Sequence, residues 1–249
     1  MCLLVLAWRT HPRYRLVVAA NRDEFHERPA APLAPWPPDG AVLAGRDLRA
    51  GGAWLGLDRA RRFGVVTNFR ELQRPQAGAP SRGSLIPRFL AGTHGAAEFF
   101  AGLEHEAPGY SGFNLLLADD ESLCYGSNRA APFARALQAG VYGLSNELLD
   151  TPWPKLLRVR AGFEEWLRAT RATVAGLFTL LNDRRQAASD ASAAATGGLP
   201  REWQQVLSAP FVLHPVYGTR CSTVVLLEPG GAAYIAERRF DAEIGRAHV

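Results

Sequence analysis

Short apolar runs alternate with turn-rich loops along much of the chain, a pattern typical of antiparallel β-hairpins. Residues 2–8 (CLLVLAW) and 14–20 (YRLVVAA) form the first two runs, and the proline-containing link between them predicts a hairpin loop. Both faces of the first run are apolar, so we expect this strand to be covered on both sides. The second run leads into the polar residues 21–24 (NRDE), which at the end of a buried strand need partners or form a site.

Three further hairpins are expected over residues 53–69, 113–125 and 222–237, and a single strand over residues 141–144. Each of these hairpins joins two apolar runs through a turn of polar residues or glycine. The segment 28–40 (RPAAPLAPWPPDG) is rich in proline, which predicts an extended surface loop.

Apolar residues at helical spacing occur in two parts of the chain. Residues 84–103 favour one or two helices, and Pro152 and Pro154 open an amphipathic pattern. Another helix is expected at about residues 173–185, and the low-complexity residues 186–198 predict a mobile loop.

The order of these elements predicts a layered α+β fold with largely antiparallel sheets, because hairpins dominate. No internal repeat or break in composition marks a boundary, so we expect residues 1–249 to form a single domain. The net charge of +4 comes with scattered arginines and no basic stripe, which argues against nucleic acid as a partner. No apolar stretch is long enough for a membrane anchor or a secretory signal, so we expect a cytoplasmic protein.

Several kinds of chemistry have no motif in this sequence. The three cysteines, Cys2, Cys124 and Cys221, do not suggest a disulfide framework, which favours a reducing compartment. The six histidines are dispersed, so we expect no zinc site. Phosphate-binding loops and nucleophile elbows are absent, so we expect no cofactor, and the polar strand ends are the main candidates for a site.

Cys2 is the first of these candidates. If Met1 is removed, one residue carries both a nucleophilic thiol and an α-amine with a pKa of about 7.7–8.0, which can act as its base. The alternative is that Cys2 is a small buried residue that begins a strand. Likewise, an Asn or Arg at a strand end is more often a turn former or a cap than a catalytic group.

Seven short motifs follow one another in a specific order: MC (1–2), AANRDEF (19–25), RP (28–29), GGAWLGL (51–57), VVTNFR (65–70), GLSN (143–146) and YGTR (217–220). In this combination the chain resembles the NRDE family, which includes the transport-and-Golgi-organisation protein 2 homologues. The resemblance runs from residue 1 to about residue 240.

The NRDE family in turn resembles the N-terminal-nucleophile hydrolases with a terminal cysteine, such as penicillin V acylase and bile salt hydrolase. This resemblance implies a four-layer αββα sandwich, helix–sheet–sheet–helix. It also implies six catalytic residues: Cys2, Arg22, Asp23, Asn68, Asn146 and Arg220.

The resemblance gives each of these residues a role around the Cys2 nucleophile. Arg22 and Asp23 match residues that hold the amine and the thiol of the cysteine. Asn68 matches a donor of the oxyanion hole, and Asn146 matches a second Asn that contacts the α-amine. The last residue, Arg220, matches a late Arg near the nucleophile.

The NRDE segment departs from the acylases, which have the order Arg-Asn-x-Asp. In a regular strand Arg22 and Asp23 point to opposite faces, so both reach the cysteine only if the strand bends or bulges. We expect Arg22 and Arg220 to lower the thiol pKa. Glu24 is expected to be a structural partner of an arginine, and a salt bridge to Asp23 is the alternative role of Arg220.

Two functions therefore follow from the sequence. The first is a hydrolase that attacks an amide or thioester bond of a small-molecule substrate through Cys2. The alternative is a non-enzymatic binding or trafficking protein on the same fold, which handles haem or acyl lipids. For haem, Cys2 and the six scattered histidines are candidate axial ligands, although none lies in a recognisable motif.

Overall fold

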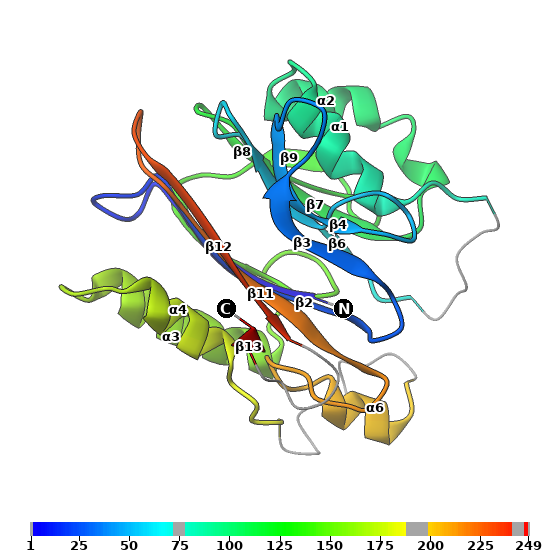
Figure 1. The fold of residues 1–249 in the computed structure, drawn as a ribbon, viewed down its shortest axis with the longest axis vertical. Coiled ribbons are helices and arrows are strands. Elements are labelled where there is room, and N and C mark those ends of the chain that lie inside the picture. The colour runs from blue at the N-terminus through cyan, green and yellow to red at the C-terminus, as the bar shows by residue number, and fades with distance from the viewer. Residues whose placement is uncertain (1, 72–77, 188–198, 241–246, 249) are drawn as a thin grey trace. The chain divides into compact units, whose positions relative to one another are not determined.

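A computed structural model describes residues 2–71, 78–187, 199–240 and 247–248. The chain divides into two compact units. The first unit is built from Met1–Glu27, Ala139–Ser145 and Leu149–Val249, and the second from Arg28–Gln138 and Asn146–Leu148. Each unit has one antiparallel sheet with helices of its own (Figure 1). The predicted α+β class with antiparallel sheets is therefore confirmed, whereas the single domain expected over residues 1–249 stays a prediction.

The sheet of the first unit has six strands. Their order is β10 (Gly140–Leu144), β1 (Cys2–Trp8), β2 (Leu16–Phe25), β11 (Tyr217–Leu227), β12 (Ala233–Phe240) and β13 (Ala247–His248). The hairpins β1–β2 and β11–β12 confirm the first and last predicted hairpins. Two strands are longer than predicted, because β2 continues through NRDE and β11 begins at YGTR.

Two helices cover one face of this sheet, which we call the helix face: α3 (Pro154–Arg168) and α4 (Val174–Leu181) (Figure 1). Pro154 begins α3, where its missing N–H costs nothing. Phe163 of α3 packs with Val5 and Ala19 of the sheet, and this contact fixes the helix on the strands. Thr173 caps α4, since its hydroxyl accepts a hydrogen bond from the amide of Gly176.

The helix α4 is shorter than the predicted 173–185, and α6 (Arg201–Val206) was not predicted. The low-complexity loop predicted for residues 186–198 lies almost wholly outside the described residues. Within the described part of the chain, no helix is long and apolar enough to cross a membrane.

The sheet of the second unit has seven strands. Their order is β3 (Ala30–Pro35), β4 (Val42–Asp47), β5 (Leu55–Asp58), β6 (Phe63–Asn68), β7 (Phe113–Ala118), β8 (Leu123–Ser127) and β9 (Ala134–Ala136). The predicted hairpins β5–β6 and β7–β8 are confirmed. The prediction of a surface loop over residues 28–40 is wrong for Ala30–Pro35, which form β3. Proline has no N–H to donate. The edge strand β3 tolerates its prolines because it has no hydrogen-bonded neighbour on its open side.

The helices α1 (Leu85–Ala91) and α2 (Ala96–Leu103) pack on this second sheet, as residues 84–103 predicted. Phe100 of α2 lies so close to Gly126 of β8 that a Cβ there would be 2.3 Å from the ring. This close approach explains why a glycine occupies the strand. Two short 3-10 helices complete the unit, η1 (Arg82–Ser84) and η2 (Ala107–Gly109).

Candidate active site

Three neighbouring strands of the first unit place Cys2, Arg22 and Cys221 in one row. Arg22 of β2 is directly opposite Cys2 in β1 and also opposite Cys221 in β11. Directly opposed residues share a face of the sheet. Arg22 is therefore beside Cys2, as the sequence predicted, and on the face opposite the helix face. Cys221, which is buried, was not predicted as a neighbour.

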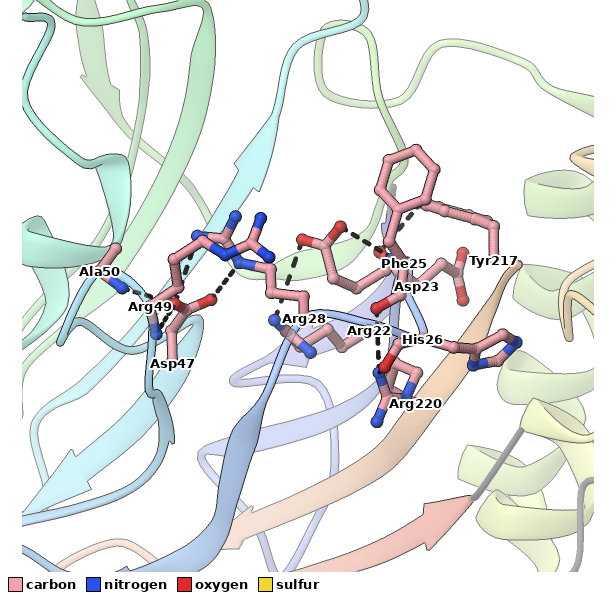
Figure 2. A network of polar contacts seen from close by, with 11 residues as sticks. Arg22, Asp23, Phe25, His26, Arg28, Asp47, Arg49, Ala50, Tyr217 and Arg220 are labelled. Atoms are coloured by element: carbon pink, nitrogen blue, oxygen red, sulfur yellow. Dashed lines mark hydrogen bonds and ion pairs between the residues drawn. The ribbon is translucent and has the colours of Figure 1, made fainter. Parts of the chain in front are cut away.

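A bulge in β11 sets the position of Arg220. Thr219 is opposite Asp23 and Cys221 is opposite Arg22, so Arg220 is an extra residue in the register. Its Nη1 donates to the carbonyls of Phe25 and His26, both at 3.0 Å (Figure 2). Arg220 thus fastens the end of β2 to β11.

The Arg220 side chain also belongs to a group of neighbouring guanidinium groups. Burial lowers the pKa of Arg220, and the positive charges of Arg22 and Arg239 lower it further. Arg220 is therefore within electrostatic range of Arg22, while its guanidinium donates hydrogen bonds to the Phe25 and His26 carbonyls.

Asp23 lies on the helix face, because its position in β2 alternates with that of Arg22. The side chain is 1% exposed, and its Oδ1 accepts a hydrogen bond of 2.7 Å from the Thr219 hydroxyl. The Tyr217 hydroxyl donates to the Asp23 backbone carbonyl at 3.0 Å. The predicted opposite faces of Arg22 and Asp23 are confirmed, and the bulge lies in β11 rather than in their own strand.

The pKa of the Asp23 carboxyl reflects a balance between burial and nearby charge. Burial raises it, whereas the N-terminal amine, Lys155, the Thr219 hydrogen bond and Arg22 act to lower it. The net effect is a raised pKa for Asp23, because the cost of removing its carboxylate from water is larger than the combined effect of these partners.

Cys2 is half-buried, and its own backbone and sulfur are held by neighbours. The Ser145 hydroxyl donates to the Cys2 carbonyl at 3.0 Å, and the Asp23 backbone amide donates to the sulfur. Burial raises the thiol pKa, and the Asp23 carboxylate also raises it. The N-terminal amine, the Asp23 amide and Arg22 act in the other direction.

The predicted lowering of the thiol pKa is therefore wrong as a net effect. Arg22 does favour the thiolate, but burial of the sulfur outweighs it. The resting state of Cys2 is consequently a neutral thiol, which needs a base before it can attack.

Asn21 and Glu24 of the NRDE segment have structural contacts. The Asn21 amide donates to the carbonyls of Leu181 (2.8 Å) and Pro210 (3.0 Å), and its Oδ1 accepts from the Ser222 hydroxyl (2.6 Å). The sequence did not single out this role for Asn21, because its partners lie far along the chain. Glu24 lies 3.9 Å from Arg22, which confirms it as the partner of an arginine.

Asn68 and Asn146 occur together in the second unit. The Asn146 side-chain amide donates to the Asn68 backbone carbonyl at 2.9 Å, and the Asn146 carbonyl accepts from the Arg70 amide at 2.7 Å. Asn146 is buried and Asn68 is exposed at the end of β6. Asn114, which the sequence did not indicate, holds the same segment by donating to the Glu147 carbonyl. The catalytic roles expected for Asn68 and Asn146 stay predictions.

Two other motifs of the second unit meet at Asp47. Its carboxylate accepts from Arg28 (2.5 Å) and from the amides of Arg49 (3.1 Å) and Ala50 (2.8 Å) (Figure 2). The Asp47 amide donates to the carbonyl of Gly52, and a Cβ on that glycine would lie 2.4 Å from the Gly83 backbone. The RP and GGAWLGL motifs therefore help to hold the backbone conformation of the turn at Asp47.

The family model described as transport and Golgi organisation 2 matches residues 1–242. The chain belongs to this family. It is 35% identical over 256 residues to the transport and Golgi organization protein 2 homolog of Bos taurus. The homolog of Homo sapiens is 32% identical over 259 residues, and each match covers 96% of this chain and 92% of the relative.

This family member also resembles a solved structure, penicillin V acylase from Agrobacterium tumefaciens. The TM-score is 0.55 with 10% sequence identity, and the match covers 99% of this chain and 84% of the acylase. At this identity the likeness shows the fold alone, which is that of the N-terminal-nucleophile hydrolases. The fold implied by the sequence resemblance is thereby confirmed.

No metal centre occurs within the described ranges, where no group of three or more His, Cys, Asp or Glu residues could hold an ion. Among the candidate axial ligands of a haem, Cys2 and His26 belong to the same unit. The His26 Nε2 is hydrogen-bonded to the His214 carbonyl at 3.0 Å. Haem binding stays a prediction.

Proposed function

We propose that this chain is a cysteine N-terminal-nucleophile hydrolase that cleaves an amide or thioester bond. Cys2 is the nucleophile once Met1 has been removed. The observation that carries the proposal is the setting of Cys2, which begins β1 opposite Arg22 with its sulfur bound to the Asp23 amide. A residue at the terminus of such a strand has its thiol and its α-amine in one small site.

The charges near Cys2 suit a neutral thiol that is activated by its own amine. Burial keeps the thiol protonated, so the proton has to leave during attack. The Asp23 carboxylate interacts electrostatically with the N-terminal amine, which in the processed chain belongs to Cys2. Asp23 then orients the amine by accepting a hydrogen bond from it, and it stabilises the α-ammonium that forms when the thiol gives up its proton.

In the reaction that we propose, the Cys2 thiol gives its proton to the α-amine while the sulfur attacks the substrate carbonyl carbon. The tetrahedral intermediate collapses with cleavage of the C–N or C–S bond, and the leaving group takes the proton from the α-ammonium. Water, deprotonated by the α-amine, then attacks the Cys2 thioester. The products are a carboxylic acid and the restored thiol.

Asn68 and Asn146 complete the proposal with the roles that the sequence assigns to them. By the family resemblance, Asn68 matches the oxyanion donor and Asn146 matches the partner of the α-amine. Loss of one oxyanion donor typically lowers kcat by about 10²–10³. Substitution of Asn68 by Ala should fall in this range.

The location that we propose is a reducing compartment, namely the cytoplasm. All three cysteines lie among the described residues and none forms a disulfide, and Cys124 and Cys221 are buried. A catalytic thiol also needs a reducing environment to remain available.

The test is hydrolysis of a panel of chromogenic anilides and acyl thioesters of graded chain length. We expect turnover by the processed wild-type chain and by Cys124→Ala, whose thiol lies in the second unit. Turnover should be lost in Cys2→Ala. Hydrolysis that survives in Cys2→Ala would refute Cys2 as the nucleophile. No hydrolysis of any member by a processed wild-type chain would argue for a binding protein.

A further inference from the structure

Lys155 is the only lysine in the chain, and its position breaks two local rules. Its side chain is 2% exposed, although lysines are almost never fully buried unless they are paired. It is also the second residue of α3, where the helix dipole disfavours a cation. A residue that contradicts both local preferences has a reason in the tertiary structure.

The surroundings of Lys155 supply that reason. Its ammonium group donates to the Leu207 carbonyl at 2.9 Å, which fixes the charge in place. From there it interacts electrostatically with the Asp23 carboxylate, which is buried on the helix face. Asp23 is held in turn by Thr219 and, at its backbone, by Tyr217.

The charged and titratable groups around Asp23 come from four elements. The Cys2 thiol belongs to the start of β1, Arg22 is the neighbour in β2, and the N-terminal amine of the chain also acts on Asp23. Tyr217 comes from β11, and burial keeps its hydroxyl neutral by raising its pKa. Lys155 of α3 is thus the cation that reaches Asp23 from the helix layer.

We propose that Lys155 is a positioning residue of the candidate site, which keeps the Asp23 carboxylate ionised so that it can hold the α-amine of Cys2. The inference rests on the proposed function for the part that concerns catalysis. A buried carboxyl without an opposite charge takes up a proton instead of remaining ionised. Lys155 supplies that charge without touching the reacting atoms.

A consequence of the proposal can be read at the Cys2 thiol. The ionised Asp23 raises the thiol pKa. If Lys155→Met lets Asp23 become neutral, this contribution disappears and the thiol pKa falls, as it does in Asp23→Asn. If Lys155 is only structural, Asp23 keeps its charge, and loss of a nearby cation leaves the thiol pKa unchanged or raises it.

The experiment follows the alkylation rate of Cys2 by iodoacetamide against pH, with the adduct mapped by peptide mass. The variants are Lys155→Met, Lys155→Arg, Asp23→Asn and the double variant Lys155→Met/Asp23→Asn. We expect the Lys155→Met and Asp23→Asn profiles to shift to lower pH by about half a unit or more. Lys155→Arg should keep the wild-type profile, and the double variant should match Asp23→Asn.

A Lys155→Met profile that is unchanged or shifted upward, beside a lowered Asp23→Asn profile, overturns the proposal. If Lys155→Met does not fold, thermal denaturation of the double variant Lys155→Met/Asp23→Asn tests the proposal instead. It should be more stable than Asp23→Asn, because it removes the buried ammonium together with the carboxylate that paired with it. Equal or lower stability contradicts the pairing.

These readouts do not depend on turnover. A chain that hydrolyses nothing but shows the expected shift refutes the hydrolase and retains the coupling of Lys155 to Asp23. An active chain without the shift retains the hydrolase and refutes the role of Lys155.

Discussion

Arg22 and Asp23 are adjacent in β2, yet their side chains act on opposite faces of the sheet. Arg22 lies beside Cys2 and Cys221, whereas Asp23 is buried with Thr219 and Lys155 on the helix face. The backbone amide of Asp23 donates to the Cys2 sulfur, and the Asp23 carboxylate acts on the thiol electrostatically. One dipeptide therefore supplies a cation to the thiol face and an anion to the opposite face.

Arg22→Gln should raise the Cys2 thiol pKa, since Arg22 favours the thiolate. A nearby positive charge favours the thiolate, so without Arg22 alkylation at pH 7 should slow severalfold. The rate of Cys2 alkylation against pH measures this shift. Arg171→Gln, at an exposed position, is the matched control and should leave the profile in place.

Asn21→Ala should reduce the stability of the fold. The substitution leaves the buried Leu181 and Pro210 carbonyls without this amide donor, and each unsatisfied group costs about 1–3 kcal/mol. Urea denaturation should show a loss of about 2–4 kcal/mol. Asn182→Ala, on the exposed end of α4, should change stability by less than about 0.5 kcal/mol. Equal losses in the two variants would contradict the structural role of Asn21.

At the scale of elements, hairpins could be predicted from the sequence, because alternating apolar runs and turn residues are local signals. β3 could not be, since its prolines are tolerated only because the strand is at an edge. The continuation of β2 through the NRDE segment could not be predicted from the local sequence pattern either. Asn21 is buried by partners 160 and 189 positions away, which no local pattern shows.

The candidate site shows the same division between local and distant signals. Cys2, Arg22 and Asn68 could be named from motifs, whereas Lys155 has no motif and depends on the packing of α3 against β1. The direction of the Cys2 pKa was also beyond the sequence, because burial depends on the tertiary structure.

The turn at Asp47 offers an element-scale test with two glycines of the second unit. A Cβ at position 52 would lie 2.4 Å from the Gly83 backbone, so Gly52→Ala should destabilise the protein by about 2–3 kcal/mol. Gly102 of α2 has open space around it, so Gly102→Ala should be stabilising by about 0.5–1 kcal/mol. Urea denaturation compares the two, and a neutral Gly52→Ala would refute the close approach.

At the scale of the whole molecule, the family model matches residues 1–242, and the chain has three thiols of unequal exposure. Cys2 is half-buried, whereas Cys124 and Cys221 are buried. Burial raises the pKa of all three thiols, so the order in which they react is set by how far each is exposed.

The native protein should therefore react with Ellman's reagent in two stages. One equivalent, lost in Cys2→Ser, should react first, and the other two should react only in denaturant. Two or three rapid equivalents in the native protein would contradict this order of thiol exposure.

The most direct test of the account is the intact mass of the purified chain before and after an acyl electrophile, with peptide mapping of the adduct. The account predicts a mass that lacks Met1 and a single adduct on the Cys2 sulfur, which Cys124→Ala retains and Cys2→Ala loses. A chain that keeps Met1 while it hydrolyses substrate, or an adduct that survives in Cys2→Ala, would contradict Cys2 as an N-terminal nucleophile.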